Sequence, residues 1–127
     1  MTDKPEILIV EDNNDNLETF STFLEFFKYP VRTASDGEEA LKSVAAKKPD
    51  VIFLDLSLPK IDGWEVARRI RSDSSNANIV IIAFSAMALP AEIERALQAG
   101  CNRFVSKPLP PETLIEEMNK LIQKRNG

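Results

Sequence analysis

Acidic side chains follow two apolar stretches of the sequence that are predicted to form buried strands. Glu11 and Asp12 come directly after residues 7–10, and Asp55 comes directly after residues 51–54. Short continuous apolar runs of this kind are typical of strands buried on both faces of a parallel sheet. Because an unpaired charge beside such a strand costs several kcal/mol of stability, we expect these carboxylates to have a compensating partner.

Ser85 and Lys107 occupy the corresponding place after two later strands. Ser85 follows the apolar residues 79–84, and Lys107 follows a weaker predicted strand at 103–105. Ligands of open parallel sheets bind outside the carboxyl ends of the strands, where the strand order reverses. We therefore expect these polar groups to converge on one pocket, although the acidic pair taken alone could simply cap the following helix.

Three carboxylates in one pocket raise one another's pKa values and cannot all stay ionised without compensation. Either a bound divalent cation or protons shared between the carboxylates would provide this compensation. Lys107 adds a single positive charge, which is too little for three acids. Since hard cations prefer oxygen ligands, we favour a site for Mg2+ or Mn2+.

The elements that position these groups alternate along the chain. The apolar patterns predict strands at 7–10, 31–34, 51–54, 79–84 and 103–105, and helices at 16–28, 36–47, 63–71, 90–98 and 111–124. Such alternation, closed by right-handed crossovers, gives an α/β fold with helices on both faces of a parallel sheet. We expect the flavodoxin-like (βα)5 three-layer sandwich, with a five-stranded parallel sheet of order 2-1-3-4-5.

Capping residues and apolar stripes support the predicted helices. Asn13 and Asn14 are suited to cap the first helix, and Ile93 and Leu97 are expected to face inward from the fourth. Phe26 points away from the apolar face of the first helix. It is expected either to pack beneath the last helix or to belong to an exposed apolar patch that binds a partner.

The composition limits the domain organisation and the class of function. The 127 residues, 43% of them apolar, suit one soluble domain, so we expect a single domain over 1–127, with its core at about 6–124 and no output domain. The net charge of −4 gives no basic excess for direct nucleic-acid binding. Because no membrane span or secretory signal is recognisable, we expect no membrane association and a cytoplasmic location.

The sequence contains no histidine and one cysteine. The absence of histidine excludes a Ser-His-Asp triad, a His-ligated metal site and a phosphohistidine within the chain. Cys101 cannot form an internal disulfide and is expected to fill a small-residue position and to be inert.

Four motifs stand at the ends of the predicted strands: EDN after the first, FLDLSLPKIDG around the third, FSA after the fourth and FVSKP at the fifth. In this order and spacing they resemble the receiver domain of two-component response regulators, over essentially the whole chain. The resemblance implies a phosphorylation-activated receiver of a phosphorelay. Its phosphoryl group would come from a sensor histidine kinase or a histidine phosphotransfer protein.

The resemblance also implies the roles of the strand-end residues. Asp55 would be the phosphoacceptor. Glu11 and Asp12 would hold Mg2+ together with Asp55 and the backbone carbonyl of Ser57. Phosphoryl transfer needs positive charge on the oxygens of the moving group, which the metal and Lys107 would supply.

A conformational switch is implied as well. Ser85 would supply a hydroxyl that moves toward the phosphoryl group and vacates space for Phe104 to turn inward. This movement would reshape the surface of the fourth helix, fifth strand and fifth helix, to which a downstream protein would bind. The peptide bond before Pro108 is expected to be cis. Met87, two residues beyond Ser85, is expected either to shield the acyl phosphate or merely to pack on its loop.

The expected protein is a signalling switch rather than an enzyme, although it would catalyse its own phosphotransfer and a slow autodephosphorylation. Phosphodonors of related systems dock beside the first helix, which makes Asn14, Leu17 and Phe26 candidate contacts. We expect a monomer or a weak dimer.

Other classes of protein fit the sequence less well. A phosphatase of the haloacid dehalogenase type needs a second acid where this chain has Ser57, and the EDNND segment would repel the phosphate of a flavodoxin-like cofactor. A receiver-like interaction module that acts without phosphorylation usually lacks the acceptor aspartate or the acid pair, and both are present here. An excised receiver of a hybrid histidine kinase stays open as an alternative.

Overall fold

The computed structural model describes residues 4–126, and within them strands and α-helices alternate along the chain as predicted. The strands are β1 (Ile7–Val10), β2 (Val31–Ala34), β3 (Val51–Asp55), β4 (Val80–Ser85) and β5 (Arg103–Ser106). The helices are α1 (Asn14–Phe26), α2 (Gly37–Ala46), α3 (Gly63–Arg71), α4 (Pro90–Gln98) and α5 (Pro111–Asn126), with a short 3-10 turn at Ser74–Asn76.

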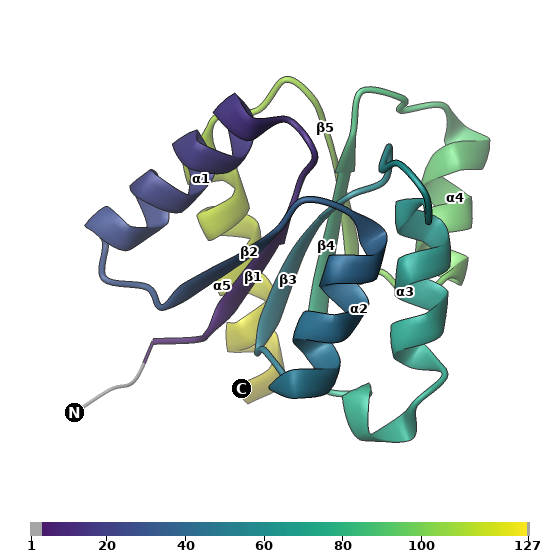
Figure 1. Cartoon of the computed structure of the whole chain (residues 1–127), viewed down its shortest axis with the longest axis horizontal. Coiled ribbons are helices and arrows are strands. Elements are labelled where there is room, and N and C mark those ends of the chain that lie inside the picture. The colour runs from purple at the N-terminus through teal and green to yellow at the C-terminus, as the bar shows by residue number, and fades with distance from the viewer. Residues whose placement is uncertain (1–3, 127) are drawn as a thin grey trace.

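The five strands form one sheet of order β2-β1-β3-β4-β5, and every neighbouring pair is parallel. Helices α1 and α5 cover one face of the sheet, and α2, α3 and α4 cover the other (Figure 1). Since β1 and β3 are neighbours, the strand order reverses between them. The predicted three-layer fold and strand order are therefore confirmed.

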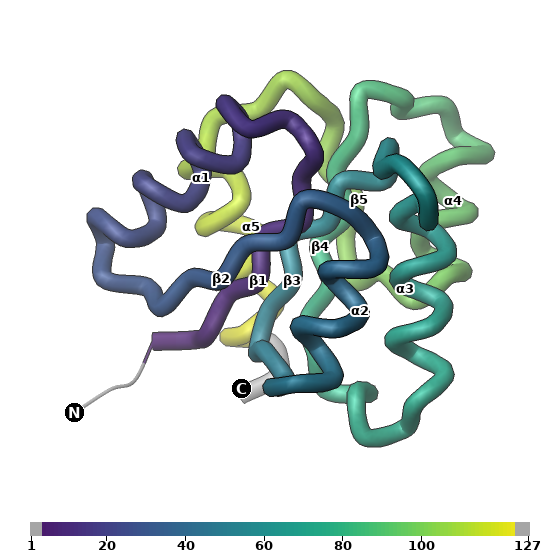
Figure 2. Tube along the Cα trace, in the orientation of Figure 1, coloured from purple at the N-terminus to yellow at the C-terminus, as the bar shows by residue number. Residues whose placement is uncertain are grey.

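The central strands are apolar because both of their faces are covered. Side chains alternate across a strand, so Ile9 and Phe53 pack with α1 and α5, whereas Leu8 and Ile52 pack with α2 and α3. All four are fully buried. This rigid centre holds the loops that follow β1, β3, β4 and β5 at one edge of the sheet (Figure 2).

Three helices begin with a side-chain cap. The side chains of Asn13, Asp36 and Asp62 each accept a hydrogen bond, at 2.9 Å, from the backbone amide three residues later. Each such cap contributes about 1 kcal/mol. Because Asn13 is the cap, α1 begins at Asn14, two residues earlier than predicted.

The prediction for α4 was wrong at Leu97, whose side chain is 48% exposed. In the part of the chain that the structure describes, Ala96 is the residue of this helix that is fully buried, and Ile93 is half-buried. Helical periodicity identifies an apolar face but not the direction in which it points. The short α4 contacts the sheet through a small side chain and leaves Leu97 at the surface.

Cys101 lies in the core on the α2, α3 and α4 face of the sheet and is 5% exposed. Burial raises the pKa of its thiol to about 12, against a smaller lowering by the nearby charge of Arg71. Since the thiolate is the reactive form, we predict that a disulfide reagent at pH 8 will label native protein at least about 100-fold more slowly than urea-unfolded protein. Equal rates in the two states would contradict this prediction.

Candidate functional site

Three buried polar side chains gather at the carboxyl edge of the sheet. Among the residues with described side chains, the buried polar or charged ones are Glu11 after β1, Asp55 at the end of β3 and Ser85 at the end of β4, each at most 1% exposed. They lie together because β1, β3 and β4 are neighbours. The convergence predicted from the strand ends is therefore what the structure shows.

Lys107, after β5, reaches across to the two buried acids. Its Nζ lies 3.0 Å from Asp55 Oδ2 and 3.2 Å from Glu11 Oε1, and 5.2 Å from the centre of the Phe84 ring. Burial lowers the pKa of Lys107, but the hydrogen bonds and charges of Asp55 and Glu11 outweigh this effect and raise it above its usual value. The ammonium therefore stays charged beside both carboxylates.

Glu11 is held in place by the start of α1. The Asn13 amide donates to its Oε2 at 3.2 Å, and the Asn16 side-chain amide donates to its Oε1 at 3.3 Å. The pKa of Glu11 is nevertheless raised to about 7, first by burial and then by the hydrogen bond and charge of Asp55. The Asn13 amide and Lys107 oppose this rise without cancelling it. Burial and the neighbouring carboxylate thus both disfavour the ionised form of Glu11.

Asp12 completes an acidic cluster with Glu11 and Asp55. One carboxylate oxygen from each residue lies within 4.8 Å of the other two. Asp12 is exposed, whereas the other two acids are buried, so the cluster opens to solvent on one side. All-oxygen ligands beside water suit a hard divalent cation that keeps part of its hydration shell. The cluster therefore fits a Mg2+ site.

The loops around the cluster carry the remaining predicted residues. The Ser57 amide donates to Asp55 Oδ1 at 2.9 Å. The Met87 amide donates to the Ser85 hydroxyl oxygen at 3.1 Å. Phe104 of β5 is half-buried and pairs with Ala83 of β4.

A backbone hydrogen bond links the residue after β5 to the last residue of β4. The backbone amide of Lys107 donates to the carbonyl of Ser85 at 2.9 Å, and the peptide bond between Lys107 and Pro108 is cis. The lysine and the serine are thus fixed relative to each other by the backbone as well as by the sheet.

Two contacts of the site were missed in the sequence. Asn16 holds Glu11 from the first turn of α1, five residues along the chain, and its type and spacing could have indicated this. Phe84 lies beneath the ammonium of Lys107, which no local pattern reveals because Phe84 is on β4 and Lys107 follows β5.

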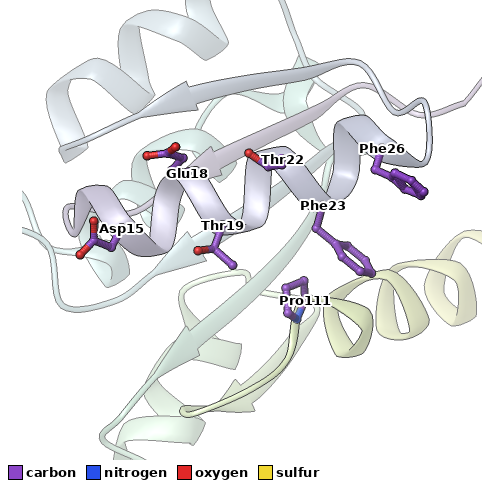
Figure 3. A pocket seen from close by; sticks show the side chains of 7 residues that line it. All are labelled: Asp15, Glu18, Thr19, Thr22, Phe23, Phe26 and Pro111. Carbon is purple, nitrogen blue, oxygen red and sulfur yellow. The ribbon is translucent and has the colours of Figure 1, made fainter.

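A second surface lies along α1, where one pocket is lined by Phe23 and Phe26 of α1 and by Pro111 of α5, and Figure 3 shows Phe23 pointing toward Pro111. Phe26 is 71% exposed, so it belongs to an exposed apolar patch and is not packed beneath α5. Of the other predicted contacts on α1, Asn14 is exposed and Leu17 is half-buried.

No helix within residues 4–126 is long and apolar enough to cross a membrane.

Comparison with known proteins gives one consistent family. A family model described as "Response regulator receiver domain" matches residues 7–119. The polar-differentiation response regulator DivK of Brucella abortus is 33% identical over 116 residues, which cover 91% of this chain and 94% of DivK.

Solved structures agree with this match. The chemotaxis response regulator CheY4 of Vibrio cholerae superposes with a TM-score of 0.87 at 28% identity, covering 94% of this chain and 98% of CheY4. The receiver domain of sensor histidine kinase PA1611 from Pseudomonas aeruginosa, solved with a magnesium ion coordinated in its active-site cleft, has a TM-score of 0.84 at 34% identity. That alignment covers 92% of this chain and 96% of the other.

Proposed function

The chain belongs to the response regulator receiver domain family, and from this premise we propose that Asp55 is its phosphoacceptor. Receiver domains of this family are signalling proteins that interact with histidine kinases and downstream targets. The observation that carries the assignment is the position of the Asp55 carboxylate, which is buried beside the acidic pair and 3.0 Å from the ammonium of Lys107.

Mg2+, or Mn2+ in its place, would be held by Glu11, Asp12, Asp55 and the backbone carbonyl of Ser57. The bound cation supplies positive charge to the oxygens of the transferring group. Asp12 is the exposed member of the cluster, so we assign it direct contact with the metal and assign Glu11 contact through water. The magnesium reported for the receiver domain of the Pseudomonas aeruginosa kinase supports this choice of metal.

The reaction would move a phosphoryl group from a histidine of another protein to this chain. A carboxylate oxygen of Asp55 attacks the phosphorus, the bond from phosphorus to the histidine nitrogen breaks, and an aspartyl phosphate forms. Lys107 exchanges one of its carboxylate partners for a phosphoryl oxygen and stabilises the added charge. The donor histidine lies outside these 127 residues, which contain none.

The test is incubation with Mg2+ and acetyl phosphate, followed by intact-mass measurement. We expect the mass to rise by one phosphoryl group, and the rise to disappear when a chelator removes the metal. A chain that never gains this mass would instead act as a receiver-like interaction module without phosphorylation.

Replacing Ser85 with alanine is expected to uncouple the switch from phosphorylation. The hydroxyl accepts a hydrogen bond from the Met87 amide in this structure and would donate to the phosphoryl group, which alanine cannot do. NMR with Mg2+ and beryllofluoride, an acyl-phosphate analogue, should show the change in the Phe104 resonances of wild type largely lost in the variant. An undiminished change would exclude Ser85 as the switch hydroxyl.

The lifetime of the acyl phosphate is expected to depend on Met87. Its side chain is 48% exposed beside the site and cannot orient water by hydrogen bonding. We predict slow autodephosphorylation, with faster loss of the phosphoryl group in a Met87→Glu variant, measured as the decay of phosphorylated mass after desalting. Equal half-lives in the two proteins would favour simple packing of Met87 on its loop.

The partner surfaces stay part of the proposal. Phosphodonors would dock beside α1, where Asn14, Leu17 and Phe26 are at least partly accessible, and targets would bind the α4-β5-α5 face. A monomeric or weakly dimeric state, a cytoplasmic location and a single domain over residues 1–127 also stay predictions. An excised receiver of a hybrid kinase would carry out the same chemistry.

A further inference from the structure

Trp64 joins α3 to α4. It is the single tryptophan of the chain and lies in the first turn of α3, where it is half-buried against the core. Its indole Nε1 donates to the carbonyl of Glu92 at 3.4 Å, and the guanidinium of Arg95 lies 4.4 Å from the ring centre. An aromatic ring attracts a cation placed over its face, most strongly when the ring is tryptophan. One side chain of α3 therefore contacts two residues of α4.

These contacts matter because α4 has few other attachments. Ala96 is its fully buried residue within the described part of the chain, and Leu97 is exposed. The N-cap position holds Leu89, which offers no side-chain acceptor to the first amides of the helix. Residues 86–90, which lead from β4 into α4, are all exposed. Segments with so little burial are the first to rearrange.

At the start of α3, the residue next to Trp64 contacts the backbone of the strand end that carries Asp55. Gly63, next to Trp64, donates its amide to the carbonyl of Leu56 at 3.0 Å. A Cβ added at Gly63 would lie 2.6 Å from the carbonyl oxygen of Asp55 and 2.5 Å from Leu56 Cα, so the two backbones are already in direct contact. A displacement of the strand end at Asp55 would thus reach Trp64 through a single intervening residue.

We propose that the contact of Trp64 with Arg95 is a latch that holds α4 in its unphosphorylated position, with Trp64 as the positioning residue. The inference rests on Asp55 being the phosphoacceptor, and it adds a connection to α4 that does not pass through Ser85 or Phe104. A latch that favours the unphosphorylated state reduces the fraction of molecules able to bind a phosphoryl group well. Opening the latch must therefore tighten the apparent binding of a phosphoryl analogue.

The experiment compares beryllofluoride binding, with Mg2+ present, in wild type and in an Arg95→Ala variant. Fluorine NMR measures binding directly, and Trp64 emission measures the surroundings of the latch. We expect the emission of wild type to change at saturation. We expect half-saturation of Arg95→Ala at an about threefold lower beryllofluoride concentration, the size of effect that an exposed cation–π contact supports. Arg95 is exposed, so the variant is expected to fold.

An Arg69→Ala variant is the matched control. Arg69 is also an exposed helical arginine, but it pairs with Glu65 of its own helix, so its loss should leave the half-saturating concentration unchanged. In a Trp64→Leu background, followed by fluorine NMR, adding Arg95→Ala should have no further effect, because both variants remove the same contact.

Two results would overturn the latch. One is a half-saturating concentration for Arg95→Ala within about 1.5-fold of wild type, too small for a cation–π contact. The other is an unchanged Trp64 emission while fluorine NMR shows a saturated site. Failure of fluorine NMR to detect any binding would instead contradict the proposed function itself, and the latch with it.

Discussion

An Asp55→Asn variant is expected to gain no phosphoryl mass on incubation with acetyl phosphate and Mg2+. The amide lacks the anionic oxygen that attacks phosphorus, and it removes one of the three carboxylates that would hold the cation. The variant should nevertheless fold, because asparagine occupies nearly the same volume and its one oxygen can still accept from the Ser57 amide, while Lys107 keeps Glu11 as a partner. The variant should therefore lose phosphorylation completely and keep its fold.

Intact-mass time courses of the two proteins measure this effect. An Asp73→Asn variant is a suitable control, since Asp73 is an exposed aspartate that caps the 3-10 turn, a role that asparagine also fills. The control should gain the same mass as wild type at the same rate. Continued gain of one phosphoryl group by Asp55→Asn would show that another residue is the acceptor.

A Gly63→Ala variant is expected to be less stable by about 3 kcal/mol, because atoms forced into a packed region cannot be accommodated without moving the backbone. The new Cβ would fall 2.5 Å from Leu56 Cα and 2.6 Å from the Asp55 carbonyl oxygen, and neither atom is on a flexible side chain. Helix propensity alone predicts the opposite sign, a gain of up to about 1 kcal/mol for alanine over glycine inside a helix. The sign of the change in stability therefore tests whether Gly63 lies in direct contact with the backbone of Asp55 and Leu56.

Urea unfolding of wild type and variant gives the free energies to compare. An exposed position such as Glu116 in α5 supplies a control, since Glu116→Ala should change stability by no more than about 0.5 kcal/mol. The variant should also be phosphorylated more slowly, because the displaced backbone carries Asp55. A more stable Gly63→Ala protein would show that the backbone at this point can shift freely.

The fold and the composition of the site could be read from the sequence because both depend on strand ends. Continuous apolar runs identified the central strands, and alternation with helices placed Glu11, Asp55, Ser85 and Lys107 at one edge of the sheet. Asp55 proved to be the last residue of its strand, paired with Phe84, instead of the first residue after it. The error is one residue and leaves the side chain in the pocket.

What the sequence could not provide depends on packing between distant segments. The direction in which α4 presents Leu97 is decided by how closely the helix approaches the sheet. The exposure of Phe26 depends on the path of α5 beside α1. The raised pKa of Glu11 follows first from its burial. That burial beside Asp55 is set by the pairing of β1 with β3, in which each residue of β1 pairs with the residue forty-four positions later in the sequence.

The strand order leaves β2 and β5 at the two edges of the sheet, and each is four residues long. The guanidinium of Arg32, in β2, bonds to carbonyls at the end of α2, and Arg103, in β5, pairs with Glu117 of α5. Prolines stand just before β2 and shortly after β5. Short, charged strands next to proline are poor templates for a strand from another molecule. The chain can thus keep a largely apolar central sheet and still resist edge-to-edge aggregation when it is concentrated.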